Sequence, residues 1–351
     1  MDRYIGLDVH SQSCTLAVED ARGKRLTERV LETNGKVLVE CLQGIAGTRH
    51  LCLEEGTQSA WLYEVLERHV DEIVVVQPEK HRGNKSDSID AWALAERLRV
   101  GAKTGRVFKA PGRFTALREA VHGYTMATQD VVRAKNRLCA VFRARAVPAA
   151  HDALYDSARR STEINKLSPP QQHLARQLGE RLDSALSAHA EAESWLREQG
   201  KLLPEVARLA TAPGIGPIRS AQIVATVVTP DRFRTSRQFW SYCGLGVVTR
   251  SSADWAKDGD GWKRRELATT RGLNRNRNPL LKNVFKGAAM TVIAQMPNHP
   301  LHADYERQLA AGTKPNLARL TLARRIAATV LAMWKTKEDY NPTKQPPKTT
   351  A

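Results

Sequence analysis

The sequence predicts a mixed α/β domain at the N-terminus, then a long helical arm and a mainly α-helical C-terminal domain. Three observations support this prediction. Apolar and polar residues alternate three times in the first 33 positions, and helix and strand patterns then take turns up to about position 99. Helical periodicity runs through residues 113–147 and 170–199, and apolar helical runs return after position 202.

Within the N-terminal domain, three strands are expected first, at 3–9, 13–18 and 25–33. Two further strands are expected at 50–55 and 72–77. Helices are expected between and after them, at 36–44, 58–68 and 86–99. Three consecutive strands followed by strand–helix alternation indicate a single mixed sheet with helices packed on it.

The middle of the chain is expected to form a pair of long antiparallel helices or a coiled-coil arm, after a break at Pro111 and Gly112. Such an arm can act as a spacer and oligomer contact, or bind nucleic acid along its basic face. The expected domains are 1–105, a metal-binding domain, 106–200, the arm, and 201–337, the C-terminal domain. The Pro- and Lys-rich tail 338–351 is expected to be disordered.

A glycine-rich turn, Pro213-Gly214-Ile215-Gly216-Pro217, lies between apolar helical runs at 202–211 and 218–228. This pattern predicts a helix-hairpin-helix. Gly214 and Gly216 would let backbone N–H groups approach a phosphate, and the next helix would add the partial positive charge of its N-terminus. Many such turns only reverse the chain, so the phosphate role depends on the basic surroundings.

The charge of the chain is strongly uneven. The whole chain has 54 Lys and Arg against 37 Asp and Glu, a formal net charge of +17. Residues 1–100 contain 13 basic and 17 acidic residues, whereas the remainder contains 41 and 20. An acidic first domain joined to a basic remainder favours a metal centre acting on a polyanion, most simply nucleic acid.

The segment 249–286 is strongly basic, with ten Lys and Arg against four acidic residues. Trp255, Trp262 and Phe285 are interleaved with these charges. Basic residues neutralise phosphates, and aromatic rings can stack on bases or pack the domain. The residues expected to contact nucleic acid here are Arg250, Lys263, Arg264 and Arg265.

The five cysteines have no CxxC spacing and an odd count, which argues against a zinc ribbon or a disulfide framework. No run of about 18 apolar residues occurs, so no membrane span is expected. The sequence begins directly with a strand pattern and shows no leader peptide. The expected location is therefore the cytoplasm.

Four carboxylates stand in or beside predicted elements of the N-terminal domain. Asp8 lies in an apolar strand, where a carboxylate loses hydration unless it is paired or holds a cation. Asp87 and Asp90 are three residues apart in the first turn of a helix and point the same way. Either Glu54 or Glu55 ends the fourth strand, and strand parity leaves the choice open. Such a set predicts a Mg²⁺ site for phosphate chemistry.

Five sequence blocks together resemble one protein family. They are Gly6-Leu7-Asp8-Val9-His10, Glu55-Gly56-Thr57-Gln58-Ser59-Ala60-Trp61, Lys85-Ser86-Asp87-Ser88-Ile89-Asp90-Ala91, Pro213-Gly214-Ile215-Gly216-Pro217, and Tyr242-Cys243-Gly244-Leu245-Gly246 followed by Arg250-Ser251-Ser252. The family is the DEDD transposases and Piv-type invertases of bacterial insertion sequences. The similarity covers residues 3–99 and 205–290. Gln58 and Ala253 depart from it, since the family usually has glycine at these places.

The resemblance implies a ribonuclease H-like, RuvC-like fold for the first domain, with Mg²⁺ held by Asp8, Glu55, Asp87 and Asp90. It places the family's nucleophilic serine on Ser251 or its neighbour Ser252, and the count from Gly244 favours Ser251. Family members are recombinases guided by a bridge RNA. The resemblance therefore implies donor and target DNA, a guide RNA and a dimer or tetramer as partners, with Arg250 neutralising the reacting phosphate.

Three alternatives differ in chemistry. A Mg²⁺-dependent junction-resolving nuclease would need the acids and water but no serine. A non-catalytic nucleic-acid-binding protein would need neither. A sugar kinase or actin-like ATPase would also begin with an aspartate in its first strand, but no Asp-Gly-Gly phosphate loop follows and the charge does not suit a small-molecule enzyme.

Overall fold

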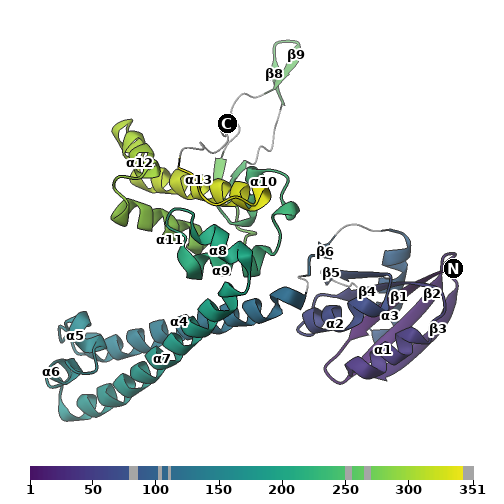
Figure 1. Cartoon of the computed structure of the whole chain (residues 1–351), viewed down its shortest axis with the longest axis horizontal. Helices are drawn as coiled ribbons and strands as arrows, with labels where there is room; N and C mark the ends of the chain where they lie inside the picture. The colour runs from purple at the N-terminus through teal and green to yellow at the C-terminus, as the bar shows by residue number, and fades with distance from the viewer. Residues whose placement is uncertain (79–85, 102–104, 110–111, 250–254, 265–269, 343–351) are drawn as a thin grey trace. The chain divides into compact units, whose positions relative to one another are not determined.

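The computed structural model describes residues 1–78, 86–101, 105–109, 112–249, 255–264 and 270–342 (Figure 1). The chain divides into two compact units, Met1–Thr115 and Ala116–Ala351. The sequence-based domain boundaries at 105, 200 and 337 stay predictions, and most of the expected tail lies outside the described residues.

Unit 1 contains a six-stranded sheet in the order β3-β2-β1-β4-β5-β6. The strands are β1 (Asp2–Val9), β2 (Ser13–Asp20), β3 (Arg25–Glu32), β4 (Thr48–Glu54), β5 (Glu72–Val76) and β6 (Arg106–Val107). β1 runs parallel to β4, and β4 to β5, whereas β2 is antiparallel to both of its neighbours. This mixed sheet confirms the predicted element order and is consistent with a ribonuclease H-like fold. The two-residue strand β6 was too short to be predicted from alternation.

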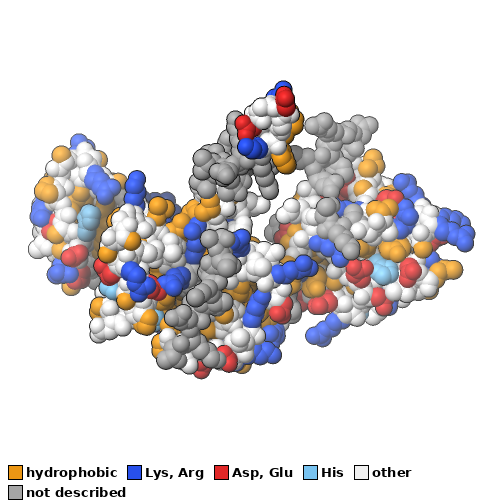
Figure 2. Space-filling view, turned by 90° about the horizontal axis from the view of Figure 1, so that it is seen from above, with side chains coloured by type: hydrophobic (Ala, Val, Ile, Leu, Met, Phe, Trp, Pro, Cys, Tyr) orange, Lys and Arg blue, Asp and Glu red, His pale blue; other side chains and the backbone are white. Residues whose placement is uncertain are grey.

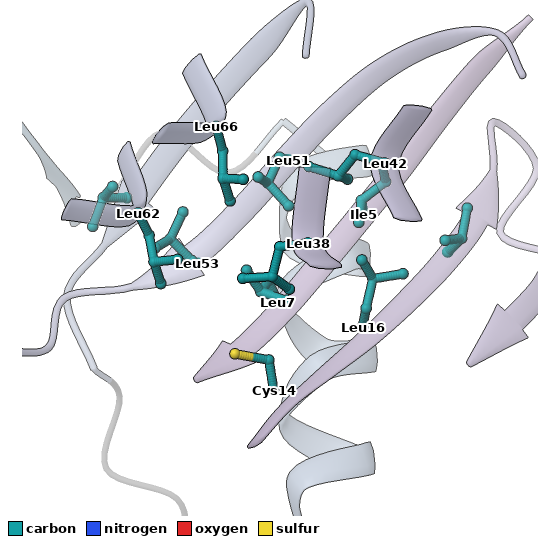
Figure 3. Close-up of a cluster of buried hydrophobic side chains, with 12 residues drawn as sticks. Ile5, Leu7, Cys14, Leu16, Leu38, Leu42, Leu51, Leu53, Leu62 and Leu66 are labelled. Carbon is teal, nitrogen blue, oxygen red and sulfur yellow. The ribbon is translucent and has the colours of Figure 1, made fainter. Parts of the chain in front are cut away.

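Helices α1 (Gly35–Gln43) and α2 (Ser59–Leu66) cover one face of this sheet. Leu38 and Leu42 of α1 pack with Leu62 and Leu66 of α2 over the strand residues beneath them, as Figure 3 shows. Those strand residues are Ile5, Leu7, Leu16, Leu51 and Leu53. All of these side chains are at most 1% exposed. Burial of each contributes about 1.5–3 kcal/mol, which fixes the strand faces that point toward α1 and α2.

Helix α3 (Asp87–Arg99) covers the opposite face. Its Leu94 and Leu98 pack with Cys52, Val74 and Val76 of the sheet. The helix lies very close to β1 at Gly6, where an added Cβ would be 1.9 Å from the carbonyl oxygen of Ala91. Only glycine allows this approach, so Gly6 sets the distance between α3 and the central strand.

The arm of unit 2 consists of α4 (Thr115–Arg143) and α7 (Pro169–Lys201), which confirms the two predicted long helices. Leu138 and Phe142 of α4 pack with Ala175 and Leu182 of α7 in one buried cluster. Two short helices between them, α5 (His151–Tyr155) and α6 (Arg160–Ile164), were not predicted. Each is only five residues long, so it shows little periodicity.

The C-terminal part of unit 2 is largely helical, as expected. Its helices are α8 (Pro204–Ala210), α9 (Gly216–Val227), α10 (Ser236–Tyr242), α11 (Pro279–Gln295), α12 (Pro300–Ala310) and α13 (Pro315–Thr336). Strand β7 (Val247–Thr249) pairs with β10 (Thr270–Leu273), and β8 (Trp255–Asp258) pairs with β9 (Gly261–Arg264). These short strands were not predicted, because charged and glycine residues obscure any alternation there.

All five cysteines are free, and four of them, Cys14, Cys52, Cys139 and Cys243, are buried. Within the described ranges, no helix combines the length and the apolar character that crossing a membrane would require.

Candidate metal centre

Asp8 lies near the end of the central strand β1, on the face covered by α3. Ile5 and Leu7 point toward α1 and α2, so the alternating residues Gly6 and Asp8 point the other way. The Asp8 side chain is 14% exposed. A carboxylate that is this buried needs a partner, because desolvation penalises its charged form.

The first turn of α3 brings two more carboxylates to this face. The Ser86 side chain caps the helix by accepting a hydrogen bond from the Ile89 backbone N–H at 3.3 Å. Asp87 and Asp90 follow in the first turn, where the helix dipole favours negative charge. Asp87 is exposed, whereas Asp90 is buried.

Glu28 of β3 holds this end of α3 against the sheet. Its Oε2 accepts hydrogen bonds from Trp92 Nε1 at 2.6 Å and from Ser88 Oγ at 2.9 Å. A charged acceptor makes both bonds stronger than neutral ones. Glu28 is therefore a positioning residue for the helix that carries Asp87 and Asp90, and it was not among the residues predicted from the sequence.

His10 brings the carboxylates together. Its Nε2 lies 3.2 Å from Asp8 Oδ2 and 3.2 Å from Asp87 Oδ1. One ligand atom from each of these three residues lies within 4.8 Å of the others, a spacing that could hold a metal ion. His10 begins the turn between β1 and β2, and Thr33 Oγ1 donates a hydrogen bond to its carbonyl at 2.8 Å. The two-residue spacing from Asp8 was the available sequence signal for His10.

The electrostatics at Asp8 fit a bound cation. Burial raises the pKa of the Asp8 carboxyl, and the charges of Asp87 and Asp90 raise it further, while His10 opposes them. Asp8 Oδ2 is buried and makes no well-aligned hydrogen bond within the described part of the chain, although it lies at ion-pair distance from His10. A divalent cation would give this oxygen a partner and offset the repulsion among the three carboxylates.

The two candidate glutamates have different surroundings. β1 and β4 are in register at Gly6–Cys52 and Leu7–Leu53, which continues to Asp8 beside Glu54. Cys52 packs against α3, so Glu54, two residues further along the strand, shares that face with Asp8. Glu54 is thus the glutamate that strand geometry directs toward the three aspartates.

Glu55 lies just beyond the strand and has a buried partner of its own. Its Oε2 is 2.5 Å from Nζ of Lys109, whose side chain is 6% exposed. Lys109 Nζ also donates a hydrogen bond to Ser59 Oγ at 2.8 Å. The motif match favoured Glu55 as the metal ligand, but this ion pair gives Glu55 a structural role at the start of α2. Lys109 is distant in sequence, and no local pattern pointed to it.

Two protein-family models match parts of this chain. A model for DEDD transposases of the IS110 type, described as "Transposase", matches residues 5–145, and one described as "Transposase IS116/IS110/IS902 family" matches residues 206–306. The chain therefore contains two segments that match IS110/IS116-family transposase domains. A "Probable family 20 transposase" of Pseudomonas aeruginosa is 28% identical over 203 residues. That match covers 54% of this chain and 58% of the relative, so this chain spans little more than half of the relative's length.

The DEDD transposase match implies the use of a divalent metal ion. The matched segment 5–145 contains Asp8 and Asp87, which lie beside His10, and Asp90, whose charge acts on Asp8. The raised pKa of Asp8 at this end of the sheet is consistent with that use of a divalent metal ion. The Piv-type part of the resemblance, the serine and the guide RNA stay predictions.

The second matched segment, 206–306, contains the glycine turn between α8 and α9. Gly214 has φ +71°, and a Cβ there would be 2.4 Å from the Ala288 carbonyl oxygen of α11. Arg219 Nη1 donates hydrogen bonds to the Gly214 carbonyl at 2.5 Å and to Thr291 Oγ1 at 2.9 Å. Gly214 is thus needed for packing. Gly216 has φ +61° and open space at its Cβ position, so of the two glycines it is the one without a packing contact there.

The structure describes only some of the other functional residues that were predicted in the C-terminal half. Arg250, Ser251, Ser252 and Arg265 lie outside the described residues, and only the backbone of Arg264 is described, in β9. Lys263 is exposed and its Nζ lies 2.6 Å from Asp258 Oδ2. Figure 2 shows Lys and Arg side chains over much of the face in view, with acidic side chains among them.

Proposed function

We propose that this chain is an insertion-sequence transposase that cuts and exchanges DNA strands with the help of a Mg²⁺ site in unit 1. The observation that carries the proposal is the approach of Asp8 and Asp87 to within 3.2 Å of His10 Nε2, in a chain matched by two transposase models. The basic remainder, with 41 Lys and Arg against 20 acidic residues, suits a DNA substrate.

The proposed ligands are Asp8, Asp87 and Asp90 with one glutamate from the end of β4. Mg²⁺ prefers oxygen ligands, so it would bind these carboxylates where the His10 imidazole now separates them. Such an ion would polarise a phosphodiester and stabilise a leaving oxygen. The role of this chain's own residues is to fix the carboxylates: Gly6 by letting α3 approach, and Glu28 by holding its first turns.

The proposed nucleophile is Ser251, as implied by the family resemblance, with Ser252 as its neighbour. In this reaction the Ser251 oxygen loses its proton and bonds to phosphorus. The 3′ oxygen of the DNA leaves with the electron pair and takes up a proton, which gives a phosphoserine link and a free 3′ hydroxyl. A serine hydroxyl is a weak nucleophile until it is deprotonated or its target is polarised. The proposal requires the carboxylates and Ser251 to act on the same phosphodiester.

A guide RNA and an oligomer complete the proposal. The family resemblance supports a bridge RNA that pairs with donor and target DNA, and a dimer or tetramer that holds both. Gly216, at the start of α9, and the basic residues Arg250, Lys263, Arg264 and Arg265 are the proposed phosphate contacts. Recombination of donor and target DNA with Mg²⁺, in the presence and absence of the element's non-coding RNA, tests the guided form. A product that forms equally well without RNA would reject it.

Replacing Ser251 by alanine tests the nucleophile. The variant is expected to lose the covalent protein–DNA adduct and to cleave at least about 10⁴-fold more slowly, because the attacking oxygen is gone. The measurement is the amount of end-labelled DNA that stays bound to the protein in SDS. Ser252→Ala is the matched control and should keep the adduct. If Ser251→Ala still cuts at the wild-type rate without an adduct, the protein is a nuclease that uses water.

Glu54→Gln and Glu55→Gln are expected to have different effects. Glu54→Gln should slow Mg²⁺-dependent cleavage by about 100-fold, since it removes a charged ligand that faces Asp8. Glu55→Gln should mainly lower the free energy of unfolding, by about 1 kcal/mol, because Lys109 loses its charged partner. Cleavage rates across a Mg²⁺ series and thermal melts measure the two effects. A Glu55→Gln variant with a normal melt but lost Mg²⁺ dependence would make Glu55 the ligand instead.

A further inference from the structure

The hairpin of β8 and β9 carries two exposed tryptophans on one face. The strands are antiparallel, with Lys257 opposite Trp262 and Trp255 opposite Arg264. Residues directly opposite each other share a face, as do residues two apart along a strand. Trp255, Lys257 and Trp262 therefore lie on the same side of the hairpin, with the two tryptophans diagonal to each other and about 7–8 Å apart at Cα.

These two side chains are the most exposed tryptophans of the seven in the chain. Trp255 is 57% and Trp262 68% exposed, whereas Trp61 and Trp195 are each 41% exposed. A hairpin of two strands has no second layer of its own to cover such rings. Two large aromatic surfaces left open on one small element indicate a binding surface more than a packing requirement.

The two faces of the hairpin carry different charged side chains. Asp258 and Lys263 occupy the reverse face and form an ion pair at 2.6 Å. On the tryptophan face, Lys257 stands directly beside Trp262. That face therefore combines aromatic rings with a positive charge, and the surrounding segment 249–286 has ten basic against four acidic residues. This combination complements a base that carries a phosphate, because the ring stacks on the base and the ammonium group neutralises the phosphate.

We propose that the β8–β9 hairpin is a stacking platform for unpaired bases of a nucleic acid. Unpaired bases are the required chemistry because a duplex hides the faces of its bases inside the stack, whereas a single strand exposes them. The inference rests on the proposed function, since it assumes that the chain acts on nucleic acid. The inference specifies which part of the substrate this surface recognises. That part is the unpaired bases, either of DNA strands opened during exchange or of the loops of a folded RNA.

The test compares Trp255→Ala, Trp262→Ala and the double variant with the full-length wild-type protein. Three fluorescein-labelled probes of one sequence are used: single-stranded DNA, single-stranded RNA and duplex DNA. Base–aromatic stacking contributes about 1–3 kcal/mol per base, so each alanine should weaken single-strand binding by about 5- to 150-fold. Duplex affinity should stay within about twofold. The two single-stranded probes distinguish DNA from RNA as the source of the bases.

Two controls separate stacking from general damage. Trp255→Phe and Trp262→Phe keep an aromatic face and should retain most single-strand affinity. Trp195→Ala removes an exposed tryptophan from α7 and should leave the single-strand affinity unchanged. Equal single-strand affinity of the double alanine variant and the wild type would overturn the inference. So would a change only in the association of copies in sedimentation, which would make the face a protein contact.

Failure of the proposed function gives a different result. If the wild type binds single strands through the hairpin but never cleaves or joins DNA with Mg²⁺, the transposase proposal fails and the stacking platform stands. If it cleaves DNA and the double variant binds normally, the platform fails and the transposase proposal stands. A wild type that binds none of the three probes overturns both.

Discussion

Replacing Asp8 by asparagine is expected to abolish Mg²⁺-dependent DNA cleavage while making the metal-free protein more stable. The loss of cleavage should be about 10³-fold or more, because the bound ion supplies several kcal/mol of transition-state stabilisation and the substitution removes a central ligand. The measurements are cleavage of end-labelled DNA and thermal unfolding in EDTA and in Mg²⁺. The two opposite effects come from the same buried carboxylate.

The gain in stability follows from the pKa of Asp8, which burial and the neighbouring aspartates raise. The folded state then holds the Asp8 proton more tightly than the unfolded state, so folding gains stability as pH falls through the folded pKa. Above that pKa the charged carboxylate is a cost, and asparagine removes it. Metal-free wild type should therefore gain stability relative to Asp8→Asn as the pH falls, and be the less stable of the two at neutral pH.

A bound cation reverses this order for the wild type. Mg²⁺ should raise its melting temperature at neutral pH, since the ion favours the charged carboxylates, and should have much less effect on Asp8→Asn. The control is Asp2→Asn, an exposed carboxylate at the other end of β1 that should preserve cleavage and the Mg²⁺ response. A melt of Asp8→Asn that still responds fully to Mg²⁺ would show that the ion binds elsewhere.

Replacing Gly6 by alanine is expected to destabilise unit 1 by about 3 kcal/mol or more and to reduce cleavage with it. The new methyl group would meet the Ala91 carbonyl at 1.9 Å, and the contact is with backbone, so the whole helix α3 must move. A displacement of about 1 Å in the helix that carries Asp87 and Asp90 can by itself cost about 10²-fold in rate. Denaturant unfolding and cleavage assays measure the two effects.

Gly44→Ala is the matched control for this substitution. Gly44 caps α1 with φ −72°, and a Cβ there would lie 3.5 Å from its nearest neighbour, an ordinary contact. Its free energy of unfolding should stay within about 0.5 kcal/mol of wild type. If Gly6→Ala were equally harmless, α3 could not pack on β1 as described, and the grouping of the three aspartates would lose its basis.

Much of unit 1 could be predicted from the sequence, because its elements are set by local periodicity. The strands that hold Ile5 and Leu16 were predicted from alternation and the strand that holds Leu51 from a short apolar run, and helix α3 begins at a serine cap followed by two acids. Predicted and observed bounds differ there by a few residues at most. The elements of the whole chain that were missed, β6, α5, α6 and β7 to β10, are too short for a period to show.

The candidate site was predicted less completely, because its partners come from different elements. His10 was quoted as part of a motif, but its position between Asp8 and Asp87 depends on the turn into β2 and on α3. The choice between Glu54 and Glu55 could not be made from parity alone, since parity gives two faces without saying which one meets α3. The pairing of Glu55 with Lys109 required the fold.

The sequence by itself determined which residues carry charge, where strands and helices begin, and that acids stand at the start of the chain while basic residues dominate the rest. These properties depend on neighbours along the chain, so they can be read from it. Only the tertiary structure decided which acids meet, that Gly214 serves packing against α11, and that two tryptophans share one open face. Those outcomes depend on strand register and on how closely backbones approach, and distant residues set both.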